Sequence, residues 1–103
     1  NSYAISTCTS EDIESPTVVG AQAANELLNI RGVKASFILT DYQNQIFISA
    51  RSIDEVNVQI IMEKMGGGGH LNIAGCQLNG VSISEGIGIL KATLDKMIEE
   101  GDL

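Results

Sequence analysis

Two stretches of alternating apolar residues, separated by a short polar segment, occupy the middle of the sequence and constrain its fold most. Apolar side chains fall at every second position in residues 33–39 and again in residues 46–50. This alternation is typical of β-strands that bury one face. The segment Tyr42–Asn44 between them predicts a tight turn, so we expect an antiparallel hairpin. The other face of the second strand carries Phe47, Ser49 and Arg51.

A strand and a helix are predicted ahead of the hairpin. The segment Tyr3–Cys8 is short, apolar and rich in β-prone residues. The pair Ser15–Pro16 supplies a helix N-cap followed by a proline at the first helical position. This helix is expected to run to about Asn29 and to end at Gly32. Its inner face is predicted from the spacing of four apolar residues: Val19, Ala23, Leu27 and Leu28.

A second helix is predicted directly after the hairpin. The segment Ser52–Glu55 fits the capping-box pattern that precedes many helices. Apolar residues then recur at helical spacing from Val58 to Met65. The glycines that begin at Gly66 would end this helix.

The remainder of the chain predicts a strand and a third helix. Residues 72–78 read as a short strand, and Asn79–Gly80 reads as a turn. The segment Ser82–Glu85 is a second capping-box pattern. The apolar spacing that follows predicts a helix that ends near Gly101.

The predicted elements follow the order β-α-β-β-α-β-α. This order describes an α/β (α+β) fold with a mixed β-sheet of four to five strands and three helices. Right-handed crossovers would make the first and second strands parallel, and likewise the third and fourth. No linker interrupts the sequence, so residues 1–103 are expected to form one domain. Because the chain does not begin with Met and enters a strand almost at once, we expect it to be a fragment of a longer protein.

Charge and composition exclude several classes of function. The net charge of −7 argues against nonspecific binding to DNA or RNA, which depends on many Lys and Arg contacts to phosphates. A small phosphate ligand held by one or two cations is still compatible with this charge. Cys8 and Cys76 lie far apart, so neither a zinc site nor a disulfide framework is indicated. No apolar run approaches the roughly 18 residues that a membrane-spanning helix needs.

Four consecutive glycines, Gly66–Gly69, precede the single histidine of the chain, His70. Glycine loses more conformational freedom on folding than any other residue, and one glycine is enough to cap a helix. Gly67, Gly68 and Gly69 can leave their N–H groups unshielded, which would let an anion approach the backbone. His70 could then hold a phosphate or the edge of a base. A flexible turn with an incidental surface histidine is the alternative.

A second group of candidate residues lies in the segment Ser49–Ser52. On a strand, Ser49 and Arg51 point to the same face, and a guanidinium suits bidentate binding of phosphate. From the residues alone, a structural ion pair for Arg51 and a helix N-cap for Ser52 stay open. A single histidine and scattered acids do not suggest a catalytic metal site or an activated nucleophile.

Residues 49–78, SARSIDEVNVQIIMEKMGGGGHLNIAGCQL, resemble the C-terminal DHH-associated domain of the DHH phosphoesterase superfamily. The glycine-glycine-glycine-histidine loop of that family matches Gly67–His70, and its small residues match Ala74–Gly75. The Ser-x-Arg-Ser segment of the family matches three further residues: Ser49, Arg51 and Ser52.

Within the superfamily, this sequence is most similar to the membrane-anchored bacterial cyclic di-AMP phosphodiesterases. Residues 21–37 share this likeness, which therefore covers nearly the whole chain. The Ala74–Gly75 pair departs from that branch, which usually has a Thr-Asn-Ala-Ala-Thr-Gln-like run after the histidine, and is closer to the nanoRNase branch.

The resemblance implies a division of labour. A DHH domain earlier in the same chain would carry two manganese ions and the hydrolytic groups. The fragment would close over the cleft and hold the nucleotide, and it would have no metal ligand and no catalytic residue of its own. Arg51 and the backbone of Gly67–Gly69 would hold phosphate, while His70 would contact phosphate or nucleotide. Two serines of the matching segment complete the substrate-binding set: Ser49 and Ser52.

The function that the resemblance implies is hydrolysis of cyclic di-AMP to pApA, in a parent protein anchored in the bacterial cell membrane with this domain on the cytoplasmic side. The fragment alone would be inactive and would not contact the membrane. One alternative is a nanoRNase or pAp phosphatase that acts on short oligonucleotides. Another is a noncatalytic nucleic-acid-binding or dimerisation domain, as in alanyl-tRNA synthetase. A homodimer is compatible with each of these functions.

Overall fold

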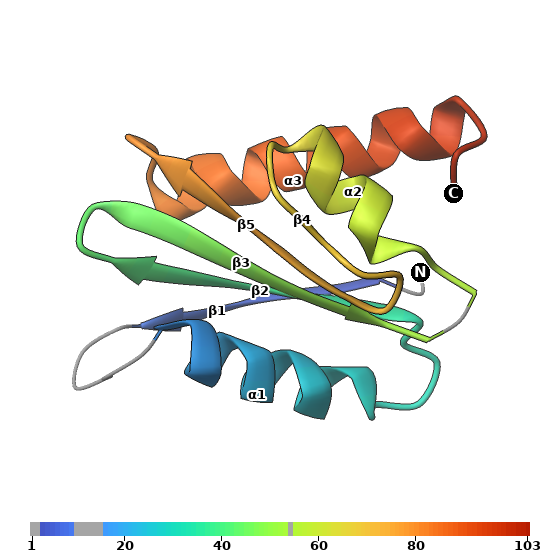
Figure 1. Cartoon of the computed structure of the whole chain (residues 1–103), viewed down its shortest axis with the longest axis horizontal. Helices are drawn as coiled ribbons and strands as arrows, with labels where there is room; N and C mark the ends of the chain where they lie inside the picture. The colour runs from blue at the N-terminus through green and yellow to red at the C-terminus, as the bar shows by residue number, and fades with distance from the viewer. Residues whose placement is uncertain (1–2, 10–15, 54) are drawn as a thin grey trace.

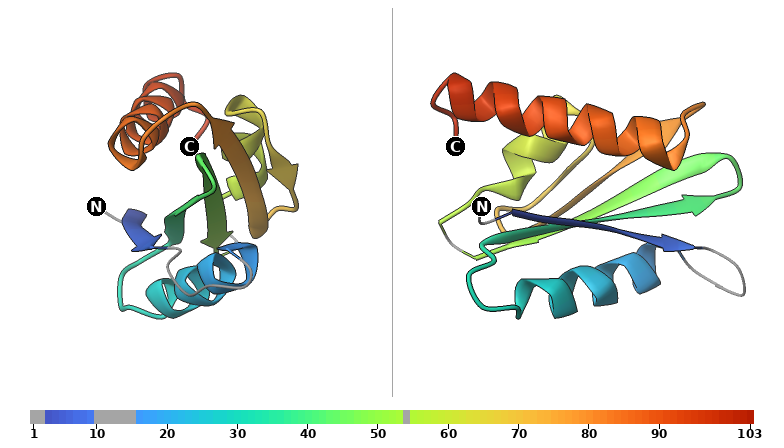
Figure 2. Two further views of the ribbon diagram at one scale, coloured as in Figure 1. Left: turned by 90° about the vertical axis from the view of Figure 1, so that its left-hand side faces the viewer. Right: turned by 180° about the vertical axis from the view of Figure 1, so that it is seen from behind.

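The computed structural model describes residues 3–9, 16–53 and 55–103. Within these ranges a five-stranded mixed sheet lies between α1 on one face and α2 and α3 on the other (Figures 1 and 2). This arrangement confirms the expected mixed α+β fold. The elements in chain order are β1 (Tyr3–Thr9), α1 (Pro16–Leu28), β2 (Ala35–Tyr42), β3 (Gln45–Ser52), α2 (Val58–Lys64), β4 (Gly68–Gly69), β5 (Ile73–Asn79) and α3 (Ile83–Glu99).

The strands lie in the spatial order β1-β2-β3-β5-β4. β1 and β2 are parallel, and β2 and β3 form the expected antiparallel hairpin. The hairpin turn places Gln43 and Asn44 at φ 51° and 63°. Positive φ at both central residues is the geometry that matches the twist of two-residue hairpins.

The expectation that the third and fourth predicted strands are parallel is wrong. β3 and β5 are antiparallel, with Ser49 opposite Gly75. The cause is an additional strand, because Gly68–Gly69 forms β4 and pairs antiparallel with β5. The hairpin between β4 and β5 reverses the chain once more after α2, so β5 runs against β3.

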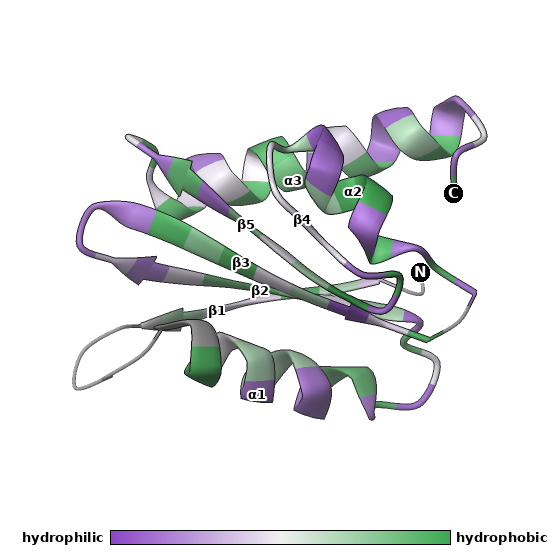
Figure 3. Cartoon of the chain, viewed as in Figure 1, coloured by the Kyte–Doolittle hydropathy of each residue, from purple (hydrophilic) through white to green (hydrophobic). Residues whose placement is uncertain are grey.

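The main hydrophobic core lies between the sheet and the α2–α3 layer. Alternate residues of β2, β3 and β5 belong to it. Figure 3 shows hydrophobic residues along β2 and β3. Burying one Leu, Ile, Val or Phe side chain contributes roughly 1.5–3 kcal/mol. The largest fully buried apolar side chains of this core are Phe37, Leu39, Ile46, Val58, Ile61, Met62 and Leu90.

The two capping-box predictions have different outcomes. Ser82 and Glu85 form the complete box at the start of α3, as expected. The prediction of a cap at Ser52–Glu55 is wrong, because β3 continues to Ser52 and α2 begins only at Val58. The N-cap of α2 is Asn57, whose Oδ1 accepts a hydrogen bond from the N–H of Ile60 at 3.3 Å.

Helix α1 approaches the sheet through small residues. Gly20 and Ala24 are buried, whereas the expected inner residues Val19 and Ala23 are only half-buried. The hydroxyl of Ser36 on β2 donates to the Ala24 carbonyl at 2.7 Å. Helix α1 packs over β2 and β3. The proposed N-cap Ser15 lies outside the described residues.

Candidate functional site

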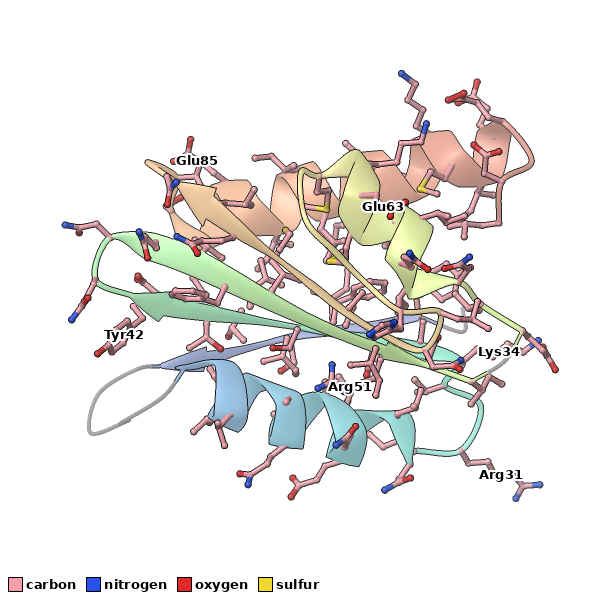
Figure 4. All side chains as sticks on the ribbon, viewed as in Figure 1. Arg31, Lys34, Tyr42, Arg51, Glu63 and Glu85 are labelled. Carbon is pink, nitrogen blue, oxygen red and sulfur yellow. The ribbon has the colours of Figure 1, made fainter. Side chains whose placement is uncertain are left out.

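A shallow groove lies on the face of the sheet that carries α1, over β3 and β5. Its lining comes from alternate positions of the two strands, and Figure 4 shows Arg51 on this side of the sheet. Helix α1 borders the groove, because a Cβ at Gly20 would lie 2.7 Å from Ser49 Oγ. The side chains and glycine that form its floor are Phe47, Ser49, Arg51, Gly75 and Gln77.

The sheet register brings Arg51 and the end of the glycine run to the same end of the strands. Arg51 lies opposite Ile73 on β5, and the N–H of His70 donates to the Ile73 carbonyl at 2.7 Å. One step along the strands, Ser49 lies opposite Gly75, which lies opposite Gly68. Neighbouring strands are about 4.8 Å apart, so the backbones of Arg51 and His70 are separated by roughly 10 Å.

The first two glycines of the run end helix α2. The Gly66 N–H donates to the Glu63 carbonyl at 3.1 Å, and the Gly67 N–H donates to the Met62 carbonyl at 2.8 Å. With Gly66 at φ +90°, this is the Schellman arrangement that closes many helices. The capping role expected for Gly66 is confirmed. The N–H of Gly67 is occupied by the helix, so this N–H does not face a ligand.

Two of the glycines let β4 approach β5 closely. A Cβ at Gly67 would lie 2.2 Å from the Gly75 carbonyl oxygen, and one at Gly69 would lie 2.5 Å from Ala74 Cα. Gly69 also has φ +146°, which side chains rarely adopt. These two positions therefore need glycine for packing, independently of any ligand.

Gly68 differs from its neighbours, because a Cβ there would meet no atom within 4 Å. Gly68 and Gly75 together leave bare backbone beside Ser49 on the open face. His70 and Ile73 exchange both backbone hydrogen bonds, at 2.7 and 3.3 Å. Since hydrogen-bonded and non-hydrogen-bonded pairs alternate in an antiparallel ladder, the N–H of Gly69 points outward from the sheet edge.

Arg51 carries a charge that no carboxylate neutralises in the described part of the chain. The ion pair found there joins Lys34 to Glu55, at 2.6 Å. Arg51 is half-buried and donates from Nη1 to the neighbouring Ala50 carbonyl at 2.8 Å. Burial lowers the pKa of its guanidinium, because the charged form loses hydration. Several of its donors are left for an anion in the groove.

Ser52 does not share the groove with Ser49 and Arg51. It is buried on the opposite face, and its hydroxyl donates to the Val56 carbonyl at 2.6 Å. Its backbone N–H donates to the Asn72 carbonyl at 3.0 Å. Ser52 therefore fixes the turn between β4 and β5, which positions His70. This position supports an indirect role in place of the contact with ligand expected from the sequence.

His70 stands at the start of that turn and is exposed. Its backbone is held by Ile73 from the turn's other side, as described above. The side chain is therefore free to meet a ligand that lies along the edge of β4.

Comparison with known proteins assigns the family. The DHHA1 domain family matches residues 1–100. The chain is a DHHA1 domain.

Two curated relatives are cyclic di-AMP phosphodiesterases. PdeA of Listeria monocytogenes is 53% identical over 73% of this chain, and GdpP of Bacillus subtilis is 51% identical over 82% of it. The matched segments make up only 12% and 13% of those proteins. A third relative, the membrane protein–large ribosomal subunit bL9 fusion protein of Onion yellows phytoplasma, is 49% identical over 80% of the chain and 10% of its own length.

Solved structures share the fold of this DHHA1 domain. An exopolyphosphatase-related protein from Bacteroides fragilis aligns with a TM-score of 0.75, covering 88% of this chain and 28% of that one, at 23% identity. The C-Ala domain of Aquifex aeolicus alanyl-tRNA synthetase aligns with a TM-score of 0.67 over 89% of each chain, at 17% identity. At these identities the likeness shows the architecture alone.

The described part of this DHHA1 domain offers no place for a catalytic metal. It holds no group of three or more His, Cys, Asp or Glu side chains that could bind an ion. Burial raises the pKa of the Cys76 thiol to about 11, so this thiol stays protonated and is neither a ready ligand nor a nucleophile near pH 7. No described helix is long and apolar enough to span a membrane.

Two residues of the groove were missed by sequence reasoning. The alternation of apolar residues places Phe47 on the correct face of its strand but does not identify its pairing partner. Gln77 lies directly opposite Phe47 and lines the same groove. The signal that could have found Gln77 is its spacing of two residues from Gly75, which puts both on one face of β5, once β5 is known to pair antiparallel with β3.

Proposed function

We propose that this DHHA1 domain is the nucleotide-holding part of a cyclic di-AMP phosphodiesterase that hydrolyses cyclic di-AMP to pApA. One observation carries the proposal. Over most of its length, the chain is about 50% identical in sequence to PdeA and GdpP, two phosphodiesterases of that specificity. Because the matched segments are a small part of those proteins, the chain would act as one domain, residues 1–103, of a longer enzyme.

The groove supports this role through its charge and its bare backbone. A phosphodiester is an anion, and Arg51 offers a guanidinium without a carboxylate partner among the described residues. Beside it, Gly68 and Gly75 expose backbone on the same face, with the Ser49 hydroxyl next to them. At the rim, the Gly69 N–H and the His70 imidazole can donate to phosphate oxygens. Ser49 and Arg51 are half-buried, and this strengthens their contacts because water screens them less.

The hydrolytic step is assigned to a DHH domain in the same longer chain. The described residues of the DHHA1 domain do not fit a metal site. The two manganese ions expected from the superfamily would therefore be held by the DHH domain. The work of this chain's own residues is to bind the dinucleotide, to orient one phosphodiester and to limit its motion. A location in a membrane-anchored parent on its cytoplasmic side is part of the same proposal, and the name of the phytoplasma relative supports it.

A second candidate is a nanoRNase or pAp phosphatase. The Ala74–Gly75 pair, which resembles that branch, favours it, and the open groove can accept a linear oligonucleotide as well as a cyclic one. Assaying cyclic di-AMP, linear pApA and short RNAs side by side separates the two activities.

The test is steady-state hydrolysis of cyclic di-AMP by the full-length protein with manganese, following pApA by chromatography. Arg51→Gln is compared with Arg31→Gln, because Arg31 is exposed and lies beyond the end of α1, away from the groove (Figure 4). A charge-assisted hydrogen bond contributes roughly 1.5–3 kcal/mol, so Arg51→Gln should lower kcat/KM roughly 10- to 150-fold. Arg31→Gln should stay within about twofold of the wild type. A wild-type enzyme that does not cleave cyclic di-AMP refutes the function, and equal effects of the two variants refute the site.

A further inference from the structure

The groove continues beyond the phosphate-binding row, away from Arg51. Phe47 and Gln77 are directly opposed on β3 and β5, two residues along the strands from Ser49 and Gly75. At about 3.4 Å per residue, this pair lies roughly 7 Å from the Ser49 row and roughly 14 Å from the Arg51 row. All of these residues line the same groove. One end of the groove is thus cationic, and the other presents an aromatic ring beside an amide.

We propose that Phe47 and Gln77 form an adenine-binding subsite, in which Phe47 stacks on the base and Gln77 reads its edge. The inference rests on the proposed function, because it takes the phosphate to lie near Arg51 and the bare glycines. A nucleotide carries its base to one side of its phosphate, and the groove leads from the Arg51 end directly to this pair.

Phe47 has the burial and support that a stacking residue needs. It is half-buried, and its ring meets Tyr42 edge-on, with centroids 6.4 Å apart and an interplanar angle of 60°. This contact holds the ring while the groove leaves part of it accessible. An aromatic face binds any base, so Phe47 contributes affinity without selecting among bases.

Gln77 supplies the selection. Its side chain is exposed, and its one hydrogen bond within the described residues is a long one, from Nε2 to Asn79 Oδ1 at 3.4 Å. The amide can therefore turn toward a ligand at little cost. A glutamine presents one acceptor and one donor side by side, which match the N6 amino group and N7 of adenine. Guanine presents acceptors at both O6 and N7, so the Gln77 carbonyl would face another acceptor.

The test measures kcat/KM of the full-length protein for cyclic di-AMP and for cyclic di-GMP. The wild type should prefer cyclic di-AMP. A bidentate contact gives roughly 5- to 150-fold discrimination, so Gln77→Leu should remove about that much of the preference. Gln77→Arg should shift the preference toward guanine, because arginine pairs with O6 and N7. Phe47→Leu should lower both activities by a similar factor, roughly 5- to 150-fold, and leave their ratio unchanged.

Gln59→Leu is the matched control. Gln59 lies on α2, on the opposite side of the sheet, where its amide donates to Glu63. It should change neither activity by more than about twofold. Because Gln77 is exposed, its variants should melt with the wild type, and thermal unfolding checks this. If the protein cleaves cyclic di-AMP but both Gln77 variants keep the wild-type adenine-to-guanine ratio within twofold, the subsite is wrong and the proposed function stands. If the wild type cleaves neither dinucleotide, both proposals fall.

Discussion

Alanine substitutions at Gly67 and Gly68, which are neighbours in one run, should have opposite effects on stability. A Cβ at Gly67 would lie 2.2 Å from the Gly75 carbonyl oxygen and 2.7 Å from Cys76 Cα. These are backbone atoms of a paired strand, so they cannot rotate away as the end of a side chain can. A Cβ at Gly68 would meet nothing within 4 Å, and Gly68 has no positive φ in the left-handed region.

The magnitudes follow from these contacts. Overpacking costs roughly 1–3 kcal/mol, and a clash with backbone places Gly67→Ala near the upper figure. In a domain of this size, 1 kcal/mol shifts Tm by about 4–8 °C, so Gly67→Ala should lower Tm by roughly 12–24 °C. Gly68→Ala removes freedom from the unfolded chain without strain and should raise stability by about 0.4–1 kcal/mol, or roughly 2–8 °C.

Affinity for cyclic di-AMP should also distinguish Gly68 from Gly67. The methyl group added by Gly68→Ala would stand on the open face in the row of Ser49 and Gly75, where the ligand is proposed to lie. We expect Gly68→Ala to weaken cyclic di-AMP about tenfold, equivalent to the loss of one contact of about 1.4 kcal/mol. Gly88→Ala is the control, because Gly88 is exposed on α3 and its Cβ would also meet nothing within 4 Å.

The assays are thermal unfolding of the 103-residue chain, followed by circular dichroism, and calorimetric titration with cyclic di-AMP. A Gly67→Ala variant that melts within 2 °C of the wild type would contradict the close packing of β4 on β5. If Gly68→Ala binds cyclic di-AMP as tightly as Gly88→Ala does, the ligand does not lie beside Gly68. Should both glycine variants lose stability equally, the distinction drawn between their environments is wrong.

Three further changes test other parts of the site. His70→Ala should leave Tm within a few degrees, because the side chain is exposed, and should weaken cyclic di-AMP binding roughly 10- to 150-fold in calorimetry; unchanged affinity would exclude the contact. Ser52→Ala leaves the Val56 carbonyl without its buried donor and should cost about 1–3 kcal/mol in urea unfolding, and an unchanged midpoint would contradict this. Burial raises the pKa of Cys76 from 9.0 to about 11. The folded state then keeps a proton that the unfolded state releases, so stability is full below pH 9 and falls by about 2–3 kcal/mol between pH 9 and 11. Cys76→Ala should abolish that slope in unfolding measured against pH.

The elements that could be predicted are those whose signals are local. The alternation of β2 and β3 and the short segment between them predict the hairpin, because pairing across a two-residue turn involves no distant part of the chain. The Ser82–Glu85 capping box predicts the start of α3, since both of its hydrogen bonds lie within one turn. The same pattern at Ser52–Glu55 does not start a helix, because Ser52 is the last residue of β3. Its N–H bonds to Asn72, which lies twenty residues away.

The direction of β5 could not be predicted for a related reason. A strand after a helix is expected to return parallel, and that rule assumes that no strand intervenes. Four glycines give no alternation and no β-prone side chain, so β4 has no signal in the sequence. Its stability comes from backbone pairing with β5 and from packing that only glycine permits. Once β4 is overlooked, the partner of Phe47 is misplaced, and Gln77 cannot be connected to the site.

The glycine run therefore serves three separate purposes, which explains why a shorter run would not suffice. Gly66 ends α2 in a left-handed conformation, and Gly67 completes the helix cap while touching β5. Gly69 fits against Ala74 with a backbone angle that other residues avoid. Gly68 alone is free of such structural demands, since its Cβ would point into open space on the face that carries Arg51. A residue that the fold does not require to be glycine, placed between two that it does, is the position where a requirement of the ligand should be visible.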